Sequence, residues 1–367
     1  MASSEPDKDI TGEILCPDVL LKVFLYLSTS DLLSAAQVCK EWRNAVDCKT
    51  SWRGRRFNID LMREFEEHFI FTFEQREIEH LCLVAPNSQK ISLAQIAERI
   101  RAIMRCFSPN LRELKIQNRR LSKTDVDVVF SDKIECLEKL EFWGVYDAAG
   151  RGLVRVSEQC PKLQHLKPHV DIPAPLIRTL GTNLPSLRTL SLGSTNTYDN
   201  GAMKDIRSYM PNLESVSLHP SLINDEGISQ LAIMRRLMSL ELTFCFFVTA
   251  EAIKFLGQAK SPLQRLILMR CLYMDPDLVL NNIGEYSLGI KELQILDSNK
   301  KVTDAGFRGL ITNAPSPLEK VCISNTRLSK PAILDVIKNS PNLLRMKLHE
   351  REVNIPETIH QQKLQWK

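Results

Sequence analysis

Cysteine is the residue type in this chain with the widest range of possible chemistry, and ten cysteines occur. No two of them are separated by two residues, the spacing that many thiol redox and zinc sites use. Cys245 and Cys271 lie 26 residues apart, and four more are spread over the first half of the chain: Cys82, Cys106, Cys136 and Cys160. We expect buried structural thiols rather than nucleophiles or metal ligands.

Two histidines, His165 and His169, lie four residues apart. In a strand their side chains would share a face but lie two pleats apart, and no third ligand is evident nearby. The sequence therefore predicts no metal site, and nothing in it points to a cofactor.

Sequence motifs for nucleotide binding or hydrolysis are absent. The chain lacks GxxxxGK[ST], GxSxG and HExxH. Gly150-Arg151-Gly152 begins like a dinucleotide-binding loop, but Arg155 occupies the place of the third glycine, so we interpret it as a surface turn. No catalytic residue is predicted, and an enzyme is disfavoured.

Composition places the chain among ordinary globular proteins. It has 367 residues, 44% of them apolar and 25% charged, with a net charge of +4. The charge is too weak and too evenly spread to predict nucleic-acid binding, and no apolar run approaches a membrane span. No secretory signal pattern is visible, so ten cysteines indicate reduced thiols in the cytoplasm or nucleus.

The elements that carry these residues follow a repeat, apolar-x-x-apolar-x-apolar, between residues 78 and 349. Successive copies from Leu111 onward begin 24 to 28 residues apart, and Pro168 takes the third apolar position of one copy. The copies begin at Ile78, Leu111, Leu137, Leu163, Leu187, Leu213, Leu237, Leu263, Ile290, Leu318 and Leu343. This period predicts an α/β solenoid of about eleven strand–helix units that forms an open arc.

Helix starts are marked between the predicted strands. Thr249, Thr303 and Ser329 each follow an apolar residue, as N-capping residues do. With Cys245 and Cys271 at the ninth position of their units, and Asn224-Asp225-Glu226-Gly227 and Cys160-Pro161 elsewhere, the repeat resembles the cysteine-containing leucine-rich repeat. The resemblance covers roughly residues 78–349.

Residues 13–57 lack the repeat and predict a small helical module. Val19, Leu20, Val23, Phe24 and Leu27 form one helical face, and a second stripe runs from Leu32 to Val46. A unit of about 45 residues buries little apolar surface alone, so we expect it to dock on the solenoid or on a partner.

This module resembles the F-box. The matching motif runs from Leu15-x-Pro17 through Asp31-Leu32-Leu33 and Val38-Cys39-Lys40-Glu41-Trp42 to Trp52. One departure is Cys16, which separates the leucine and proline that are adjacent in the family. The resemblance implies adaptor-binding residues at Leu15, Pro17, Leu20, Leu21, Val23, Phe24, Leu27, Leu32, Val38, Cys39, Trp42 and Trp52. For Trp42, a core role and an interface role are equally open.

An F-box followed by leucine-rich repeats is similar to the substrate receptors of Skp–cullin–F-box ubiquitin ligases. That similarity implies a Skp-type adaptor, a cullin reached through it, and a protein substrate held by the repeats for ubiquitination and degradation. The alternative is a non-degradative scaffold that binds partners without cullin. A sensor of a small hormone is disfavoured, because about eleven units give an open arc and not a ring.

Alternation along each strand should place its third, fifth and seventh positions on the face opposite the core. Five of the seven histidines fall on these positions. We predict a substrate groove there, suited to an acidic or phosphorylated segment, at Trp143, His165, Lys167, His169, His219, Arg265, Met269, Lys320, Arg345 and Lys347. The alternative is an ordinary mixed polar face.

Three further segments complete the predicted organisation. Residues 1–12 are expected to be disordered, and residues 58–77 to link the module to the solenoid and cap it. Four phenylalanines in that linker favour a cap over a ligand pocket: Phe65, Phe69, Phe71 and Phe73. Residues 350–367 form a tail that is either disordered or folded back on the strand face through Val353, Ile355, Ile359, Leu364 and Trp366.

Overall fold

The computed structural model shows two compact units, residues 1–114 and 115–367, and each is described here by itself. The structure describes residues 16–61, 76–84, 93–107, 110–121, 127, 129–131, 133–144, 149–169, 172–195, 198–220, 222–313, 315–349, 351–353 and 355. The N-terminal twelve residues and the four linker phenylalanines lie outside this part.

The first unit begins with four short helices: α1 (Pro17–Phe24), α2 (Thr29–Ala35), α3 (Lys40–Asp47) and α4 (Lys49–Trp52). Pro17 occupies the first turn of α1, where its missing N–H removes no hydrogen bond. The Ser28 hydroxyl caps α2 by accepting from the backbone N–H of Asp31 at 3.1 Å. The helical module predicted from the sequence is therefore present.

The core of this module is apolar. Side chains of its last helix and of the segment after it donate hydrogen bonds to backbone carbonyls of earlier residues. Leu20, Phe24, Leu32 and Trp52 are at most 2% exposed. The Trp52 indole donates to the Val46 carbonyl at 2.6 Å. Arg55 donates through one guanidinium nitrogen to the Phe24 carbonyl at 2.5 Å and through the other to the Leu27 carbonyl, so it satisfies the C-terminal end of α1.

The first unit also contains strands β1 (Arg56–Asp60) and β2 (His80–Val84) and helix α6 (Leu93–Phe107). Strand β1 crosses the predicted boundary between the module and the linker at residue 57, and it pairs in parallel with β2. Its signal is the alternation of Phe57, Ile59 and Leu61, all buried. The strands therefore begin one element earlier than the first predicted repeat, because the β1 stretch is too short to show the LxxLxL pattern.

Every one of the eleven predicted repeat copies contains a strand. After β2, these strands are β3 (Glu113–Leu121), β4 (Lys139–Gly144), β5 (His165–His169), β6 (Thr189–Thr195), β7 (Ser215–Pro220), β8 (Ser239–Thr243), β9 (Arg265–Met269), β10 (Glu292–Leu296), β12 (Lys320–Ile323) and β14 (Arg345–Leu348). The predicted solenoid is confirmed in fold class and in period.

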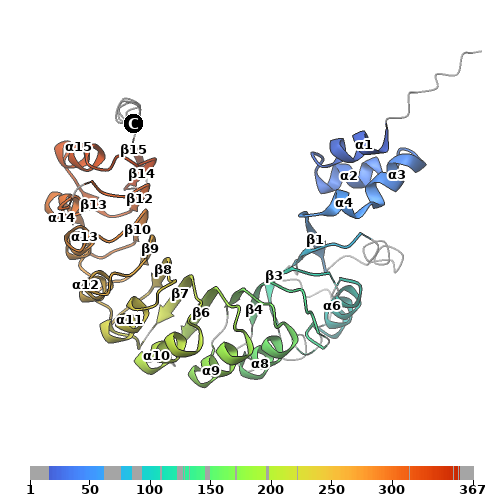
Figure 1. Ribbon diagram of the computed structural model, residues 1–367, viewed down its shortest axis with the longest axis horizontal. Coiled ribbons are helices and arrows are strands. Elements are labelled where there is room, and N and C mark those ends of the chain that lie inside the picture. Colours follow the sequence, from blue (N-terminus) through green and yellow to red (C-terminus); the bar gives the residue numbers. More distant parts are fainter. Residues whose placement is uncertain are drawn as a thin grey trace, which may run out of the picture. The chain divides into compact units, whose positions relative to one another are not determined.

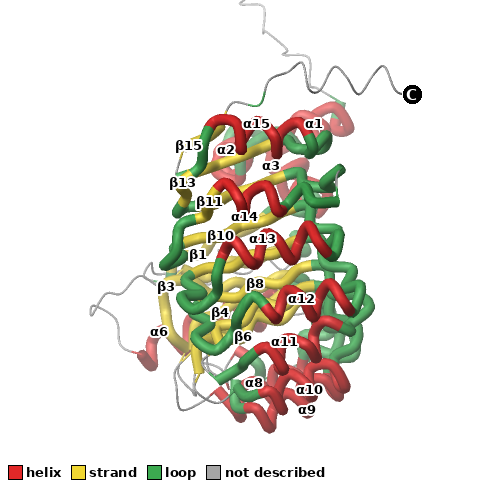
Figure 2. Tube along the Cα trace, turned by 90° about the vertical axis from the view of Figure 1, so that its left-hand side faces the viewer, coloured by secondary structure: helices red, strands yellow, loops and turns green. Residues whose placement is uncertain are grey.

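Helices alternate with these strands in the second unit: α8 (Ala149–Gln159), α9 (Ala174–Asn183), α10 (Asn200–Tyr209), α11 (Asp225–Ala232), α12 (Glu251–Gln258), α13 (Pro276–Glu285), α14 (Asp304–Gly309) and α15 (Lys330–Lys338). They lie along the outer side of the curve, and the strands line its inner side (Figures 1 and 2). A small pair, β11 (Val302–Thr303) and β13 (Thr326–Arg327), adds a second sheet.

From β4 to β14 each strand pairs in parallel with the next strand of the inner sheet, so equivalent residues of successive units form lateral rows. Leu240, Leu266, Leu293 and Val321 are one such row, and each is at most 1% exposed. Pro168 does not end β5, because it still registers with Phe142 of β4 and is buried. The stacked leucine rows are the core of this unit.

The sheet of the second unit is open, and its last described strand runs against the others. Strand β15 (Arg351–Val353) pairs antiparallel with β14, with Lys347 opposite Glu352. Val353 therefore lies in an edge strand, whereas Ile359, Leu364 and Trp366 of the predicted tail lie outside the described residues. None of the helices described is long and apolar enough to cross a membrane.

Candidate functional site: two exposed surfaces

Helix α1 presents apolar side chains to solvent as well as to its core. Val19 and Val23 are 45% and 47% exposed, and Tyr26, in the turn after the helix, is 92% exposed. These residues are four and three positions apart, so they share one helical face. Val38, before α3, is 63% exposed. A group of exposed apolar side chains on so small a module is typical of a surface that binds a second protein.

Exposure divides the predicted adaptor-binding residues into two groups. Pro17, Val23, Val38 and Cys39 are exposed, and Leu21, Leu27 and Trp42 are partly exposed. Leu20, Phe24, Leu32 and Trp52 are buried, so their assignment as contact residues is corrected: these four side chains hold the module together. Leu15 lies outside the described residues.

Trp42 packs against the core and still has an exposed part, so its position is compatible with both roles that the sequence left open. Its ring meets the buried Phe24 ring edge to face, with centroids 5.4 Å apart, and it remains partly exposed. The module is further held by Arg76, whose guanidinium lies 4.7 Å from the Trp52 ring centroid and bonds Asp47 at 2.7 Å.

The second surface is the inner face of the strands in the second unit. Strand register places the predicted groove residues in rows, so that Lys139 lies beside His165 and Glu141 beside Lys167. His165 Nδ1 lies 2.9 Å from the Thr189 hydroxyl. Burial lowers the pKa of His165, and the positive charges of Lys139 and Lys167 lower it further.

We define the first basic cluster as Lys139, His165 and Lys167, whereas the predicted basic spot combined His165 and Lys167 with His169. Glu141 bonds Lys115 at 2.8 Å, whereas Lys167 is exposed and makes no ion pair with a described residue. Trp143 and His169 lie opposite each other in β4 and β5, but their side chains lie outside the described part.

The second predicted cluster is smaller than expected. Arg265 bonds Glu292 at 3.2 Å, and Arg345 bonds Glu352 of β15 at 3.1 Å, so both guanidinium charges already have partners. Lys320 and Lys347 are exposed on neighbouring strands and form no ion pair within the described chain. Arg265 also lies three strands from Arg345, so we restrict the second basic cluster to Lys320, Arg345 and Lys347.

Some inner-face positions are less accessible than strand alternation predicts. Ile267 is 6% exposed and Thr243 is fully buried. Ile267 registers between Glu241 and Gln294, and these longer side chains flank it on both sides. Met269, a predicted contact, is half-buried beside Thr243, and His219 is partly exposed with its ring centroid 6.4 Å from that of Phe244.

Four of the six cysteines expected to be buried are buried, Cys82, Cys160, Cys245 and Cys271, whereas Cys106 and Cys136 are partly exposed. Burial raises the pKa of Cys160 to about 12. Cys271 Sγ donates to the Leu242 carbonyl of the neighbouring strand at 3.4 Å. Among the described residues no group of three histidine, cysteine, aspartate or glutamate side chains could hold a metal ion.

Two sets of exposed apolar residues were not found from the sequence. Leu25 and Tyr26 were placed inside the helical module, although their spacing from Val19 and Val23 puts them at its open edge. Phe244, Phe246 and Phe247 follow β8, and Tyr273 follows β9; all four are at least 39% exposed. Three phenylalanines in four residues directly after a strand are the sequence signal that was available.

Comparison with known proteins identifies the N-terminal module. A family model described as F-box-like matches residues 15–58. Two solved structures are similar to most of the chain. The yeast Rad7–Elc1 complex matches at 18% identity and a TM-score of 0.49 over 94% of this chain and 84% of that one. The TLR13–ssRNA13 complex matches at 14% identity and a TM-score of 0.44 over 82% of this chain and 41% of that one.

Proposed function

We propose, from an F-box-like domain joined to a leucine-rich-repeat solenoid, that this chain is the substrate-recognition subunit of a Skp–cullin–F-box ubiquitin ligase. In this role the domain binds a Skp-type adaptor, which bridges to a cullin. The solenoid holds a protein substrate for ubiquitination and proteasomal degradation in the cytoplasm or nucleus. The chain performs no chemistry itself and acts by raising the local concentration of substrate lysines near the ubiquitin donor.

The observation that carries this proposal is the exposed apolar face of the F-box-like domain. Val19, Val23 and Tyr26 form one stripe, while Leu20 and Phe24 of the same helix are buried. The contact surface and the core therefore lie on opposite sides of α1. Burial of such a stripe by an adaptor removes apolar area from water and fixes a domain that has little core of its own.

The test is co-purification of adaptor and cullin with the full chain from cells. The variant Val23→Asp/Val38→Asp places charges on exposed positions and should lose both partners while the chain stays folded. Leu344→Asp is the matched control, because Leu344 is 61% exposed in the second unit. Leu20→Asp is unsuitable, since that side chain is 2% exposed and a charge there unfolds the domain.

Each result has a definite meaning. Loss of adaptor and cullin in the double variant, with retention in Leu344→Asp, supports the ligase receptor. If the wild-type chain co-purifies with the adaptor but not with cullin, the result supports a non-degradative scaffold instead. Absence of both from folded wild-type protein contradicts adaptor binding altogether.

We further propose that the inner face of the strands binds the substrate through its two basic clusters. Lys167, Lys320 and Lys347 are exposed and have no described ion-pair partner, so their charges are available to a carboxylate or phosphate. An acidic or phosphorylated substrate segment fits that charge. Proteins that accumulate when the chain is depleted and that co-purify with Val23→Asp/Val38→Asp are the candidates to test.

The strand-face proposal is tested with those candidates. Lys320→Ala/Lys347→Ala should weaken their recruitment and reduce its dependence on salt concentration, because fewer charges are exchanged on binding. Lys330→Ala/Lys338→Ala on the outer helix α15 is the matched control. Unchanged recruitment by Lys320→Ala/Lys347→Ala would place the substrate elsewhere on the chain.

A further inference from the structure

The loops that follow β7, β8 and β9, together with the first turn of α13, expose a group of large apolar side chains, of which Phe244 lies next to His219 of the inner face. We define it as the aromatic rim; its members and their exposures are Leu222 (49%), Phe244 (39%), Phe246 (40%), Phe247 (58%), Tyr273 (72%) and Leu278 (54%). Surface phenylalanines and tyrosines scattered singly need no explanation, but a group in three successive units does.

The register of the sheet makes this group continuous. Ser239 of β8 pairs with Arg265 of β9, an offset of 26 residues, and the same offset relates Phe247 to Tyr273. These two rings therefore occupy the same place in neighbouring units, whose strands are about 4.8 Å apart. Asn224 forms an isolated bridge with Phe247, which joins the loop that carries Leu222 to the same row.

Phe244 carries its ring on a turn that recurs from unit to unit. Its φ is +56°, and Arg270 and Asp297 share that left-handed conformation in the next two units, so the conformation belongs to the repeat and not to this residue alone. The ring is held in place by the Arg270 guanidinium 5.1 Å from its centroid. It remains 39% exposed, so part of the ring is available to another molecule.

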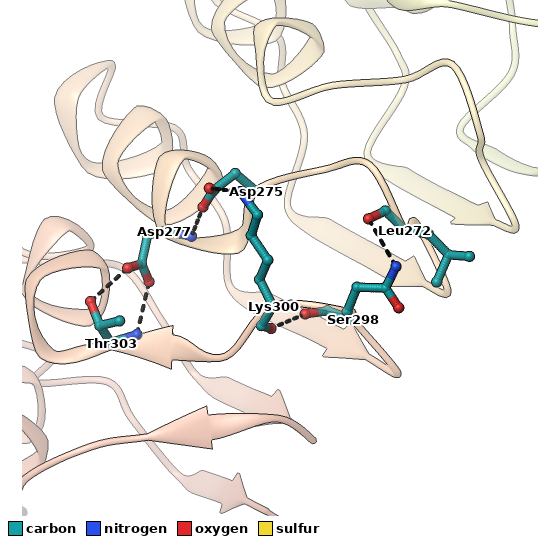
Figure 3. A network of polar contacts seen from close by, with 7 residues as sticks. Leu272, Asp275, Asp277, Ser298, Lys300 and Thr303 are labelled. Atoms are coloured by element: carbon teal, nitrogen blue, oxygen red, sulfur yellow. Dashed lines mark hydrogen bonds and ion pairs between the residues drawn. The ribbon is translucent and has the colours of Figure 1, made fainter.

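The charges around the rim are acidic once internal pairs are removed. Arg270 bonds Asp297 at 3.1 Å and Lys300 bonds Asp275 at 2.7 Å (Figure 3). Lys254 on α12 bonds Glu251. Three carboxylates beside the rim have no cationic partner among the described residues: Asp225 and Asp277 accept from Thr249 and Thr303, and Glu226 accepts from the Asn200 amide.

We propose that the aromatic rim is a second docking surface, and that it binds a protein segment in which apolar side chains alternate with lysine or arginine. The rim supplies aromatic anchors and an arginine, the residue types that dominate protein interfaces, and its residual carboxylates complement a basic segment. This charge preference is opposite to that of the basic clusters on the inner face. The inference therefore does not depend on adaptor binding or on the substrate proposed for that face.

The test uses the full-length protein and a phage library of random dodecapeptides, followed by fluorescence anisotropy with the selected peptides. Phe247→Ser/Tyr273→Ser removes the two most exposed rings and should weaken binding about tenfold or more, because a few central aromatics dominate such contacts. Glu226→Gln should weaken binding roughly two- to threefold and reduce its salt dependence. Leu344→Ser is the control for loss of an exposed apolar side chain, and circular dichroism verifies folding of each variant.

Selection of peptides that combine apolar and basic residues, with affinities that fall in Phe247→Ser/Tyr273→Ser but not in Leu344→Ser, supports the proposal. Selection of acidic peptides, or of peptides whose binding depends on Lys320 and Lys347, overturns it in favour of the inner face. Light scattering is measured in parallel. A dimer that Phe247→Ser/Tyr273→Ser dissociates also overturns the proposal, because the rim would then join two copies of this chain.

Discussion

At the scale of single residues, exposure separates positions that a sequence motif treats alike. Leu20 and Val23 lie on the same short helix and both belong to the F-box motif, yet one is 2% and the other 47% exposed. A charge at Leu20 tests folding, whereas a charge at Val23 tests partner binding.

His165 provides a prediction at the same scale. Burial and the charges of Lys139 and Lys167 lower its pKa in the folded chain, so the unfolded chain binds more protons below about pH 6.5. The free energy of unfolding should therefore fall as pH is lowered through and below 6.5, and His165→Gln should flatten this dependence. Denaturant titrations at pH 7.5 and 5.5 measure the effect.

The cause of that shift is tested separately. Lys139→Met removes one nearby positive charge and should raise the pKa of His165, as followed by NMR titration of its ring. Lys330→Met, on an outer helix, should leave that pKa where it is. A pKa of His165 at or above 6.5 in the wild type would contradict both statements.

At the scale of elements, successive units are joined by a repeated side-chain clip at the helix starts. Asp277 accepts from the Thr303 backbone N–H at 2.9 Å and from its hydroxyl at 2.6 Å (Figure 3). Asp225 does the same to Thr249, at 2.7 Å for both bonds, and Asp304 does so to Ser329. The hydroxyl predicted to cap α14 thus donates to the preceding unit instead.

The clip predicts a stability effect at a surface position. Asp277→Ala leaves the Thr303 N–H and hydroxyl without their charged acceptor and should destabilise the chain by about 1–2 kcal/mol. The thermal midpoint by circular dichroism is the measurement. Glu251→Ala, which removes only the surface pair with Lys254, should change it far less.

Close contact between neighbouring helices gives a second prediction for elements. A Cβ on Gly284 of α13 would lie 1.8 Å from the Gly309 carbonyl oxygen of α14, so the two helices must move apart. Gly284→Ala should cost roughly 1–3 kcal/mol, the range for overpacking. Gly289→Ala is the matched control, because its Cβ would meet nothing closer than 3.9 Å. Equal thermal midpoints for the two variants would contradict this packing.

At the scale of the whole molecule, the proposed function makes partner binding and substrate binding separable. The exposed face of α1 lies in the first unit, and the basic clusters lie in the second. Val23→Asp/Val38→Asp should therefore still bind substrate but no longer deliver it. When this variant is overproduced, we expect substrate half-life to lengthen at least about twofold in a chase after translation is blocked, because it competes with functional receptor.

The matched experiment combines both changes. Adding Lys320→Ala/Lys347→Ala to the adaptor-deficient variant should restore the normal substrate half-life, since the chain then binds neither partner. If the lengthened half-life persists, the basic clusters do not hold the substrate.

Much of this fold could be predicted from the sequence, because the determining pattern is local and repeated. Leucines at a period near 26 residues specify a strand that buries every second residue, and stacking identical units requires no long-range information. Each of the eleven predicted copies contains a strand. The F-box motif is also contiguous, and the family match at residues 15–58 agrees with its placement.

What only the tertiary structure decided is which side chains of each pattern remain accessible and which charges remain unpaired. Strand β1 becomes evident through its pairing with β2, and Arg345 loses its free charge because the chain reverses and brings Glu352 beside it. Side chains of the neighbouring strands bury Ile267. The corresponding neighbours of Phe247 leave its ring exposed. Burial depends on residues one repeat away, about 26 positions along the chain, and the Arg345 ion pair depends on a chain reversal, so the sequence could indicate the faces but not their final chemistry.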